Sequence, residues 1–249
     1  MRGTTRFGRR AAMAACMAWA QAVSAQPAAP QAAQDTEVFS ADVVIEDSIV
    51  DANGAVVDTR PATRYHLTRR RVDGAIETEI TYPPAKLYAK GPLVDPRSGM
   101  RMVYGASGTL RIYDAKGVLV QTLEMPAPPD GGADATVVFA DRDVRRRRDG
   151  LQRRMGRAAG RLGRHDRYVT TDAEATTETL VEPGTMLPVE VNVVRGGALA
   201  ERNQLAYGRM PGGRWYLARQ RSEHAMADGS GRRFVSTRTH VNVSGSEGR

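Results

Sequence analysis

The folding pattern of this chain is clearest in the stretch Phe39-Ser-Ala-Asp-Val-Val-Ile-Glu-Asp-Ser-Ile-Val50 and in Asp51-Ala-Asn-Gly54, which follows it. Apolar and polar side chains alternate along its first half, and a period of two residues is typical of a strand with one buried face. Asn-Gly is a strong turn signal, and an extended pattern resumes from Ala55 to Thr59, so the sequence predicts a hairpin. The apolar parity holds Phe39, Ala41, Val43 and Ile45, and the polar parity holds Ser40, Asp42 and Glu46.

The same pattern recurs immediately downstream. The segment Arg64-Tyr-His-Leu-Thr-Arg-Arg-Arg-Val72 is separated by Asp73-Gly74 from Ala75-Ile-Glu-Thr-Glu-Ile-Thr-Tyr82, in which isoleucines alternate with glutamates. Asp-Gly between two alternating segments again predicts a two-residue hairpin turn. Pro83-Pro84 then ends the strand, because proline cannot donate to a ladder.

Further extended segments follow at similar spacing, with turn residues between them. Because strands follow strands without helical patterns between them, the chain favours an antiparallel meander over a parallel sheet. We therefore expect a mainly β (α+β) fold of about ten strands, built as a curved antiparallel sheet with one or two helices. The later segments are Met100 to Tyr104, Thr109 to Asp114, Val118 to Met125, Arg167 to Thr171, Thr176 to Glu182, Pro188 to Arg195, Leu199 to Tyr207, Arg214 to Glu223 and Phe234 to Val243.

An arginine-rich change of pattern between Asp141 and Arg167 predicts a helical insert. Apolar residues recur every three or four positions from Leu151 to Leu162, which gives one apolar stripe and a basic back, although Gly156 and Gly160 weaken the helix. Such a basic face suits anionic lipid head groups, where each basic residue contributes about 1 kcal/mol. The alternative is a solvated helix or loop in an arginine-rich protein. The residues expected to contact a membrane surface are Arg145, Arg146, Arg147, Arg148, Arg153 and Arg154.

The first 25 residues have the composition of a cleavable secretory signal. Four arginines and no acidic residue precede the weakly apolar run Ala11 to Ala20, and Val23-Ser-Ala25 ends in the small residues that signal peptidase reads. The run is about half of the ~20 residues that span a bilayer. We expect cleavage after Ala25, a linker over 26–35 and one periplasmic domain over 36–245. The alternative is a lipid anchor at Cys16.

Removal of this signal changes the charge of the chain. The net charge of +8 falls to +4, because 32 basic residues then face 28 acidic residues. Aromatic residues make up only 6% of the chain, which argues against stacking on single-stranded nucleic acid. We therefore expect no nucleic-acid partner, and we expect the protein to be a monomer.

Candidate catalytic and metal-ligating residues are sparse. The four histidines, His66, His165, His224 and His240, lie far apart and have no cysteine or carboxylate at zinc-ligand spacing. His165 and Asp166 are adjacent, so their side chains point apart on a strand, and no Gly-x-Ser-x-Gly turn accompanies them. The glycine pairs lie between strands and are typical of turns. We expect no catalytic activity, no metal and no cofactor.

The order of three segments resembles the outer-membrane lipoprotein-sorting (LolA/LolB-like) periplasmic superfamily and its related envelope sensors. They are the opening hairpin from Phe39, the strand Ser107-Gly-Thr-Leu-Arg-Ile-Tyr-Asp114, and Val181-Glu-Pro-Gly-Thr-Met-Leu-Pro-Val-Glu-Val191. The resemblance extends from Phe39 to Val243. It implies a half-open, strongly curved antiparallel sheet with one or two helices on its concave side and a cavity for acyl chains.

The resemblance makes the apolar parity a candidate ligand-binding face for lipid or the acyl chains of a lipidated protein. Burial of an acyl chain there would contribute about 0.8 kcal/mol per CH₂. The simpler alternative is a filled core made by the same residues. An alternative function for the same fold is an envelope sensor or scaffold that pairs an edge strand with an extended peptide. The candidate ligand-binding residues are Phe39, Val43, Ile45, Tyr65, Leu67, Ile76, Ile80, Met102, Tyr104, Leu110 and Ile112.

Overall fold

The computed structural model describes residues 38–72, 75–84, 96–105, 108–125, 137–138, 144–210 and 213–246. The expected signal, the linker and Cys16 lie outside these ranges. Within them, no helix has both the length and the apolar character needed to cross a membrane.

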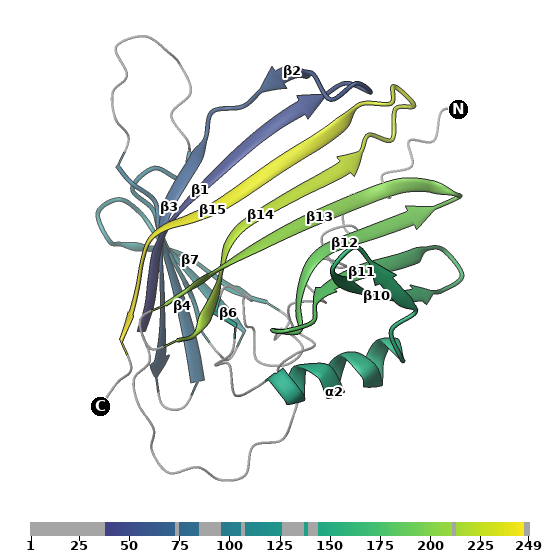
Figure 1. Cartoon of the computed structure of the whole chain (residues 1–249). Coiled ribbons are helices and arrows are strands. Elements are labelled where there is room, and N and C mark those ends of the chain that lie inside the picture. The colour runs from purple at the N-terminus through teal and green to yellow at the C-terminus, as the bar shows by residue number, and fades with distance from the viewer. Residues whose placement is uncertain are drawn as a thin grey trace.

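Strands make up most of the described chain, and they form one sheet of fifteen strands (Figure 1). The first half of the chain supplies β1 Val38–Val50, β2 Val56–Thr59, β3 Thr63–Val72, β4 Ala75–Thr81, β5 Arg101–Tyr104, β6 Thr109–Tyr113, β7 Leu119–Glu124 and β8 Val137–Val138. The second half supplies the helix α2 Val144–Met155, then β9 Gly160–Leu162, β10 His165–Thr171, β11 Thr176–Glu182, β12 Leu187–Arg195, β13 Ala198–Arg209, β14 Trp215–Ala225 and β15 Arg233–Ser246.

The sheet consists of two meanders joined by the strands that come first and last in the chain, β1 and β15. Its order is β7-β6-β5-β4-β3-β1-β15-β14-β13-β12-β11-β10-β9, with β2 paired to β1 and β8 to β14, and the paired strands run antiparallel. The path ends at β7 and β9, so the sheet stays open. Figure 1 shows it curved, with β10 to β14 in front of β4, β6 and β7. The predicted fold class, a curved, open antiparallel sheet, is confirmed.

The predicted hairpins form as the turn residues indicate. Gly54 has a φ of 84°, in the left-handed region that glycine tolerates. The Asp51 carboxylate accepts hydrogen bonds from the backbone N–H groups of Asn53 and Ala55, both at 2.9 Å. Local turn chemistry therefore sets the register of β1 and β2, and β3 and β4 pair on either side of Asp73-Gly74 as expected.

The helix lies earlier in the chain than the sequence predicts. The helix ends at Met155 because Gly156 takes a φ of 73° and caps it, with its N–H donating to the carbonyl oxygen of Gln152 at 3.0 Å. The prediction of a helix as far as Leu162 was wrong. Leu162 instead ends β9, which pairs with β10, and its side chain is 54% exposed.

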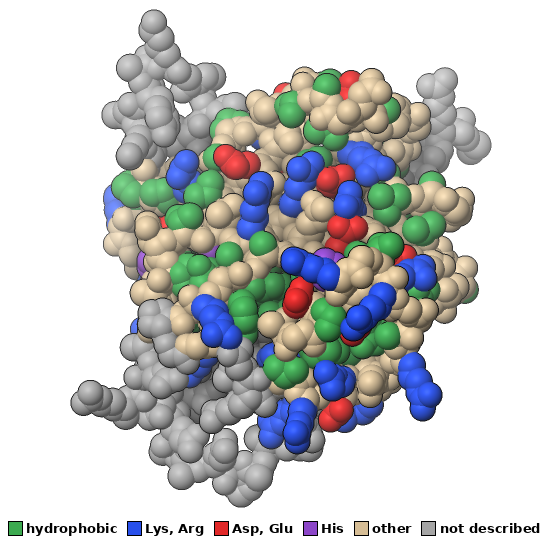
Figure 2. All heavy atoms as spheres, in the orientation of Figure 1, with side chains coloured by type: hydrophobic (Ala, Val, Ile, Leu, Met, Phe, Trp, Pro, Cys, Tyr) green, Lys and Arg blue, Asp and Glu red, His purple; other side chains and the backbone are tan. Residues whose placement is uncertain are grey.

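The two faces of the sheet differ in character. The inner face, defined here as the face that carries Phe39, Val43 and Leu67, holds most of the buried side chains, and the outer face carries residues of the opposite parity, such as Ser40 and Asp42. Figure 2 shows acidic and basic side chains interspersed over the strands nearest the viewer. The single described helix covers the inner face, because Leu151 packs against Tyr168, Val181 and Met186.

Candidate functional site

The apolar part of the inner face spans five neighbouring strands, β1 and β3 to β6. Cross-strand pairs keep one parity together: Val43 lies opposite Tyr65, Leu67 opposite Ile80, and Ile80 opposite Met102. The structure therefore brings the candidate ligand-binding residues onto one face, although the side chain of Ile76 lies outside the described part. Phe39, Val43, Tyr65, Leu67 and Leu110 are less than a tenth exposed, whereas Ile45, Ile80, Met102, Tyr104 and Ile112 are partly buried.

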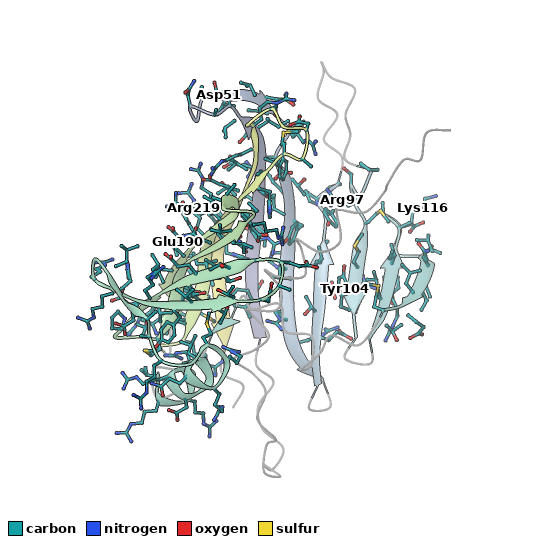
Figure 3. The ribbon with its side chains drawn as sticks, turned by 90° about the vertical axis from the view of Figure 1, so that its right-hand side faces the viewer. Asp51, Arg97, Tyr104, Lys116, Glu190 and Arg219 are labelled. Carbon is teal, nitrogen blue, oxygen red and sulfur yellow. The ribbon has the colours of Figure 1, made fainter. Side chains whose placement is uncertain are left out.

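Residues from elsewhere in the chain pack onto this apolar face and were not predicted. Met210, which follows β13, and Tyr216 of β14 join the cluster around Phe39 and Tyr65. The ring centroids of Phe39 and Tyr216 are 6.5 Å apart, and those of Tyr65 and Tyr82 are 5.6 Å apart. No local pattern could reveal these contacts, because they depend on the curvature of the whole sheet. Figure 3 shows that curvature, with Tyr104 and Glu190 on opposite halves.

The inner face becomes polar where it passes to β13 and β14. Asn203 is 4% exposed and its Nδ2 donates to the Glu201 carboxylate at 2.8 Å, while Ser222 Oγ donates to the side-chain oxygen Oδ1 of Asn203 at 2.6 Å. Gln220 donates to Ser222 at 3.2 Å, and His224 Nδ1 lies 3.8 Å from Glu201. We call Glu201, Asn203, Gln220 and Ser222 the polar row. It gives the inner face a polar region beside its apolar region.

One arginine of α2 is part of the inner face rather than of the surface. Arg147 is 2% exposed, and its Nε donates to the carbonyl oxygen of Thr185 at 2.8 Å. Burial raises the pKa of the nearby Tyr207 phenol, and the Arg147 charge works in the opposite direction. Arg147 therefore holds the helix on the sheet and is not part of its exposed basic surface.

The other predicted membrane-contact arginines of α2 are exposed. Figure 2 shows basic side chains gathered at the lower end of the molecule, where Figure 1 places the helix. The helix has no acidic residue in its first turn, and Asp149 is its acidic residue. The exposed basic face consists of Arg145, Arg146, Arg148, Arg153 and Arg154.

The outer face carries a hydrogen-bonded series of polar side chains that the sequence did not predict. His66 Nδ1 lies 2.8 Å from Asp42 Oδ1, and His66 Nε2 lies 2.8 Å from Ser40 Oγ. Ser40 and Asp42 are two residues apart on β1, so they share its outer face, and His66 lies directly opposite Asp42 on β3. The shared parity of Ser40 and Asp42 was visible in the sequence, but their meeting with His66 depends on the register of β1 and β3.

A bulge in the neighbouring strand completes this series. Asn242 of β15 has a φ of 52°, and the register of β1 and β15 shifts beside it, between Ser40 and Asp42. Its Nδ2 donates to Asp42 Oδ2 at 2.8 Å. Hydrogen bonds from Asn242, and then from His66, lower the pKa of Asp42. Both oxygens of this carboxylate are therefore held by neighbouring strands.

The remaining histidines do not join a metal site. His165 Nε2 lies 3.6 Å from Glu182, His224 lies near Glu201, and His240 is 5% exposed on the inner face. Among the residues that the structure describes, no group of three or more histidine, cysteine or acidic side chains could hold a metal ion.

Comparison with known proteins concerns the whole sheet. No protein-family model matches the chain, and the comparison with curated proteins finds no match. A LolA superfamily protein from Nitrosomonas europaea is similar in structure, with 12% identity and a TM-score of 0.44 over 93% of this chain and 92% of that chain. A chain of the Pseudomonas aeruginosa MucA/MucB complex has 13% identity and a TM-score of 0.25 over 88% of this chain and 89% of that chain.

Proposed function

We propose that this chain is exported to the periplasm and that its inner face serves there as a non-catalytic binding site for lipid or lipidated protein. The observation that carries the proposal is the inner face, where apolar side chains of five neighbouring strands lie in register on an open sheet. The proposal assigns no catalytic step to this face.

The two regions of the inner face suit an amphipathic ligand. The apolar region would bury an acyl chain, at about 0.8 kcal/mol for each CH₂ removed from water. Met100 and Met102 are partly buried and pack against this region, and the thioether side chain adapts readily to different chain shapes. The polar row on β13 and β14 would satisfy a polar head group, because buried polar groups of the ligand need hydrogen-bond partners.

Native mass spectrometry of protein purified from its own envelope tests the proposal. We expect a co-purifying lipid, and we expect the delipidated protein to take up palmitate or a synthetic dipalmitoyl peptide. Met102→Glu should abolish uptake, because it places a charge on the apolar face. Val57→Glu is the matched control, since Val57 on β2 is 54% exposed. An empty protein that takes up neither probe would refute lipid binding.

We also propose that the exposed basic face of α2 contacts anionic membranes. Each arginine near such a surface contributes about 1 kcal/mol, and salt screens the attraction. Co-sedimentation should therefore be stronger with phosphatidylglycerol vesicles than with phosphatidylcholine vesicles and should weaken as salt rises. The double variant Arg145→Gln and Arg146→Gln should lose this preference, whereas equal binding to both vesicles would refute the contact.

A second function, an envelope sensor or interaction scaffold, is favoured by one observation. β7 is an end strand of the sheet, and Val118, Leu119 and Val120 are between 50% and 57% exposed. An exposed apolar edge strand can pair with an extended peptide. Native mass spectra would then show a bound peptide instead of lipid, and Val120→Pro, which disturbs strand pairing, should remove that peptide.

A further inference from the structure

We propose that Ser40 is a nucleophile activated by His66 and Asp42, and that this site on the outer face cleaves small acyl esters. The site is separate from the inner face to which ligand binding is assigned. Its evidence is the pair of contacts at 2.8 Å that join Ser40 Oγ to His66 and His66 to Asp42.

The partners of His66 fix where its protons lie. An ionised carboxylate can only accept hydrogen bonds, so the nitrogen that faces Asp42, Nδ1, carries the proton. In the neutral imidazole the other nitrogen, Nε2, is then an acceptor, and it faces the Ser40 hydroxyl. This is the tautomer that a general base needs to remove a serine proton. The arrangement has the order nucleophile, base and orienting carboxylate.

The backbone around Asp42 supports this assignment independently. Asn242 occupies the left-handed region in the bulge beside Asp42, and its amide donates to the oxygen that His66 leaves free. Bulges re-aim side chains, and a non-glycine residue in that region costs free energy that the surrounding structure must supply. The result is a carboxylate fixed from β3 on one side and from β15 on the other. Asp42 and Asn242 are therefore positioning residues, while Ser40 and His66 would touch the substrate.

The exposure of the site indicates which class of substrate it can bind. The side chains of His66 and Asp42 are 49% and 46% exposed, so a solute can reach them from the solvent. Ser40, Asp42 and His66 are polar side chains on this outer face, so the site itself offers no apolar surface that would bury a long acyl chain. Short-chain esters with a good leaving group are the substrates that this geometry suits.

Water is the only reactant that the reaction needs besides the ester. Ser40 Oγ forms a bond to the ester carbonyl carbon while its proton passes to His66 Nε2. The bond from that carbon to the alcohol oxygen breaks, and the alcohol leaves with the proton from His66. Water then attacks the acyl-serine, His66 takes its proton, and the carboxylic acid leaves as the serine hydroxyl is restored. β1 is paired on both edges, so its backbone N–H groups mostly donate within the sheet and offer little stabilisation to the oxyanion, and we expect slow turnover. With a good leaving group acylation is faster than deacylation, and an acyl-serine should then accumulate.

Labelling of the purified protein with a fluorophosphonate tests the proposal, because the serine oxygen displaces fluoride and keeps the phosphonyl group. Peptide mapping should place the label on Ser40. Ser40→Ala should abolish labelling, and His66→Gln should slow it by about a hundredfold. Ser244→Ala is the matched control, because Ser244 lies opposite Ser40 on β15, is exposed and should not be needed.

The positioning role of Asp42 has its own readout. In Asp42→Asn, ¹⁵N NMR of His66 should show loss of the Nδ1–H preference, together with slower labelling, while circular dichroism stays unchanged. A burst of p-nitrophenol from p-nitrophenyl acetate, with an acetyl group on the Ser40 peptide, would support the same chemistry. No label, a label on another serine, or labelling that His66→Gln leaves unchanged would overturn the proposal.

Discussion

Arg147 of α2 donates a hydrogen bond from Nε to the carbonyl oxygen of Thr185 at 2.8 Å, in the turn between β11 and β12. An arginine that is 2% exposed ties the helix to the sheet in the middle of a strongly basic, exposed segment. Removal of a charged hydrogen-bond donor from a buried site costs roughly 2 kcal/mol. We therefore expect Arg147→Ala to lower the free energy of unfolding by about 2 kcal/mol in urea denaturation.

The neighbouring Arg146 provides the comparison, because its side chain is exposed on the same helix. Arg146→Ala should change the free energy of unfolding by less than about 0.5 kcal/mol. If both substitutions changed the free energy of unfolding equally, the buried hydrogen bond of Arg147 would not stabilise the fold.

Gly208 on β13 and Tyr216 on β14 pair directly, and the tyrosine ring lies where a side chain on Gly208 would be. A Cβ atom at Gly208 would lie 2.6 Å from both Cζ and the hydroxyl oxygen of Tyr216. Gly208→Ala should therefore displace the ring from its contact with Phe39 and destabilise the protein by about 1–3 kcal/mol. Thermal unfolding followed by near-ultraviolet circular dichroism would measure both the stability and the tyrosine environment.

A second glycine should respond with the opposite sign. Gly150 lies inside α2, and a Cβ atom there would meet no atom within 4 Å. Gly150→Ala should stabilise the protein by about 0.5–1 kcal/mol, because alanine favours the helix more than glycine does. A loss of stability in this variant would contradict the open surroundings of Gly150.

The Asp42 carboxylate should titrate below its ordinary pKa of 3.8, because Asn242 and His66 donate to its charged form. Asn242→Gly keeps a residue that tolerates a φ of 52° but removes the donor. Carbon-detected NMR should show a low pKa for Asp42 in the parent protein and a pKa closer to 3.8 in the variant. Identical titration curves would mean that the Asn242 hydrogen bond is not formed in solution.

The strands were predictable because their signals are local. Alternation in Phe39 to Val50 and the Asn53-Gly54 turn define a hairpin without reference to the rest of the chain. The pairing of β1 with β15 joins residues about two hundred positions apart, and no local pattern contains that information. The contact between Asp42 and Asn242 was therefore beyond sequence reasoning, although each residue lay in a correctly predicted strand.

The prediction of the helix bounds was wrong for a related reason. Its periodicity in apolar residues was real as far as Met155, but the left-handed conformation of Gly156 ends the helix. The segment that follows pairs with β10, and tertiary pairing of this kind outweighs a weak helical preference. Arginine content alone also could not separate Arg147, which the fold buries, from the exposed arginines beside it.

Glu190 on β12 is the best place to test how the outer face responds to acid. Burial alone would raise its pKa, but hydrogen bonds from Arg202, Asn192 and Gln204 outweigh that effect and lower it. The donor distances are 2.9, 3.0 and 3.3 Å. Because the folded-state pKa lies below the unfolded value of 4.5, the stabilisation is complete above about pH 4.5 and is lost as the pH falls through the folded-state pKa.

Glu190→Gln should therefore be less stable than the parent protein by about 1 kcal/mol at pH 7, and this difference should shrink as the pH falls below 4.5. Urea denaturation at a series of pH values measures it. Glu46→Gln is the control for the loss of a carboxylate at pH 7, because Glu46 is exposed on the same outer face. Neutralising the Glu190 carboxylate removes the charged partner of Arg202, so the difference should shrink. A difference that stayed constant down to pH 3 would contradict this, because protonation of Glu190 would then not weaken the fold.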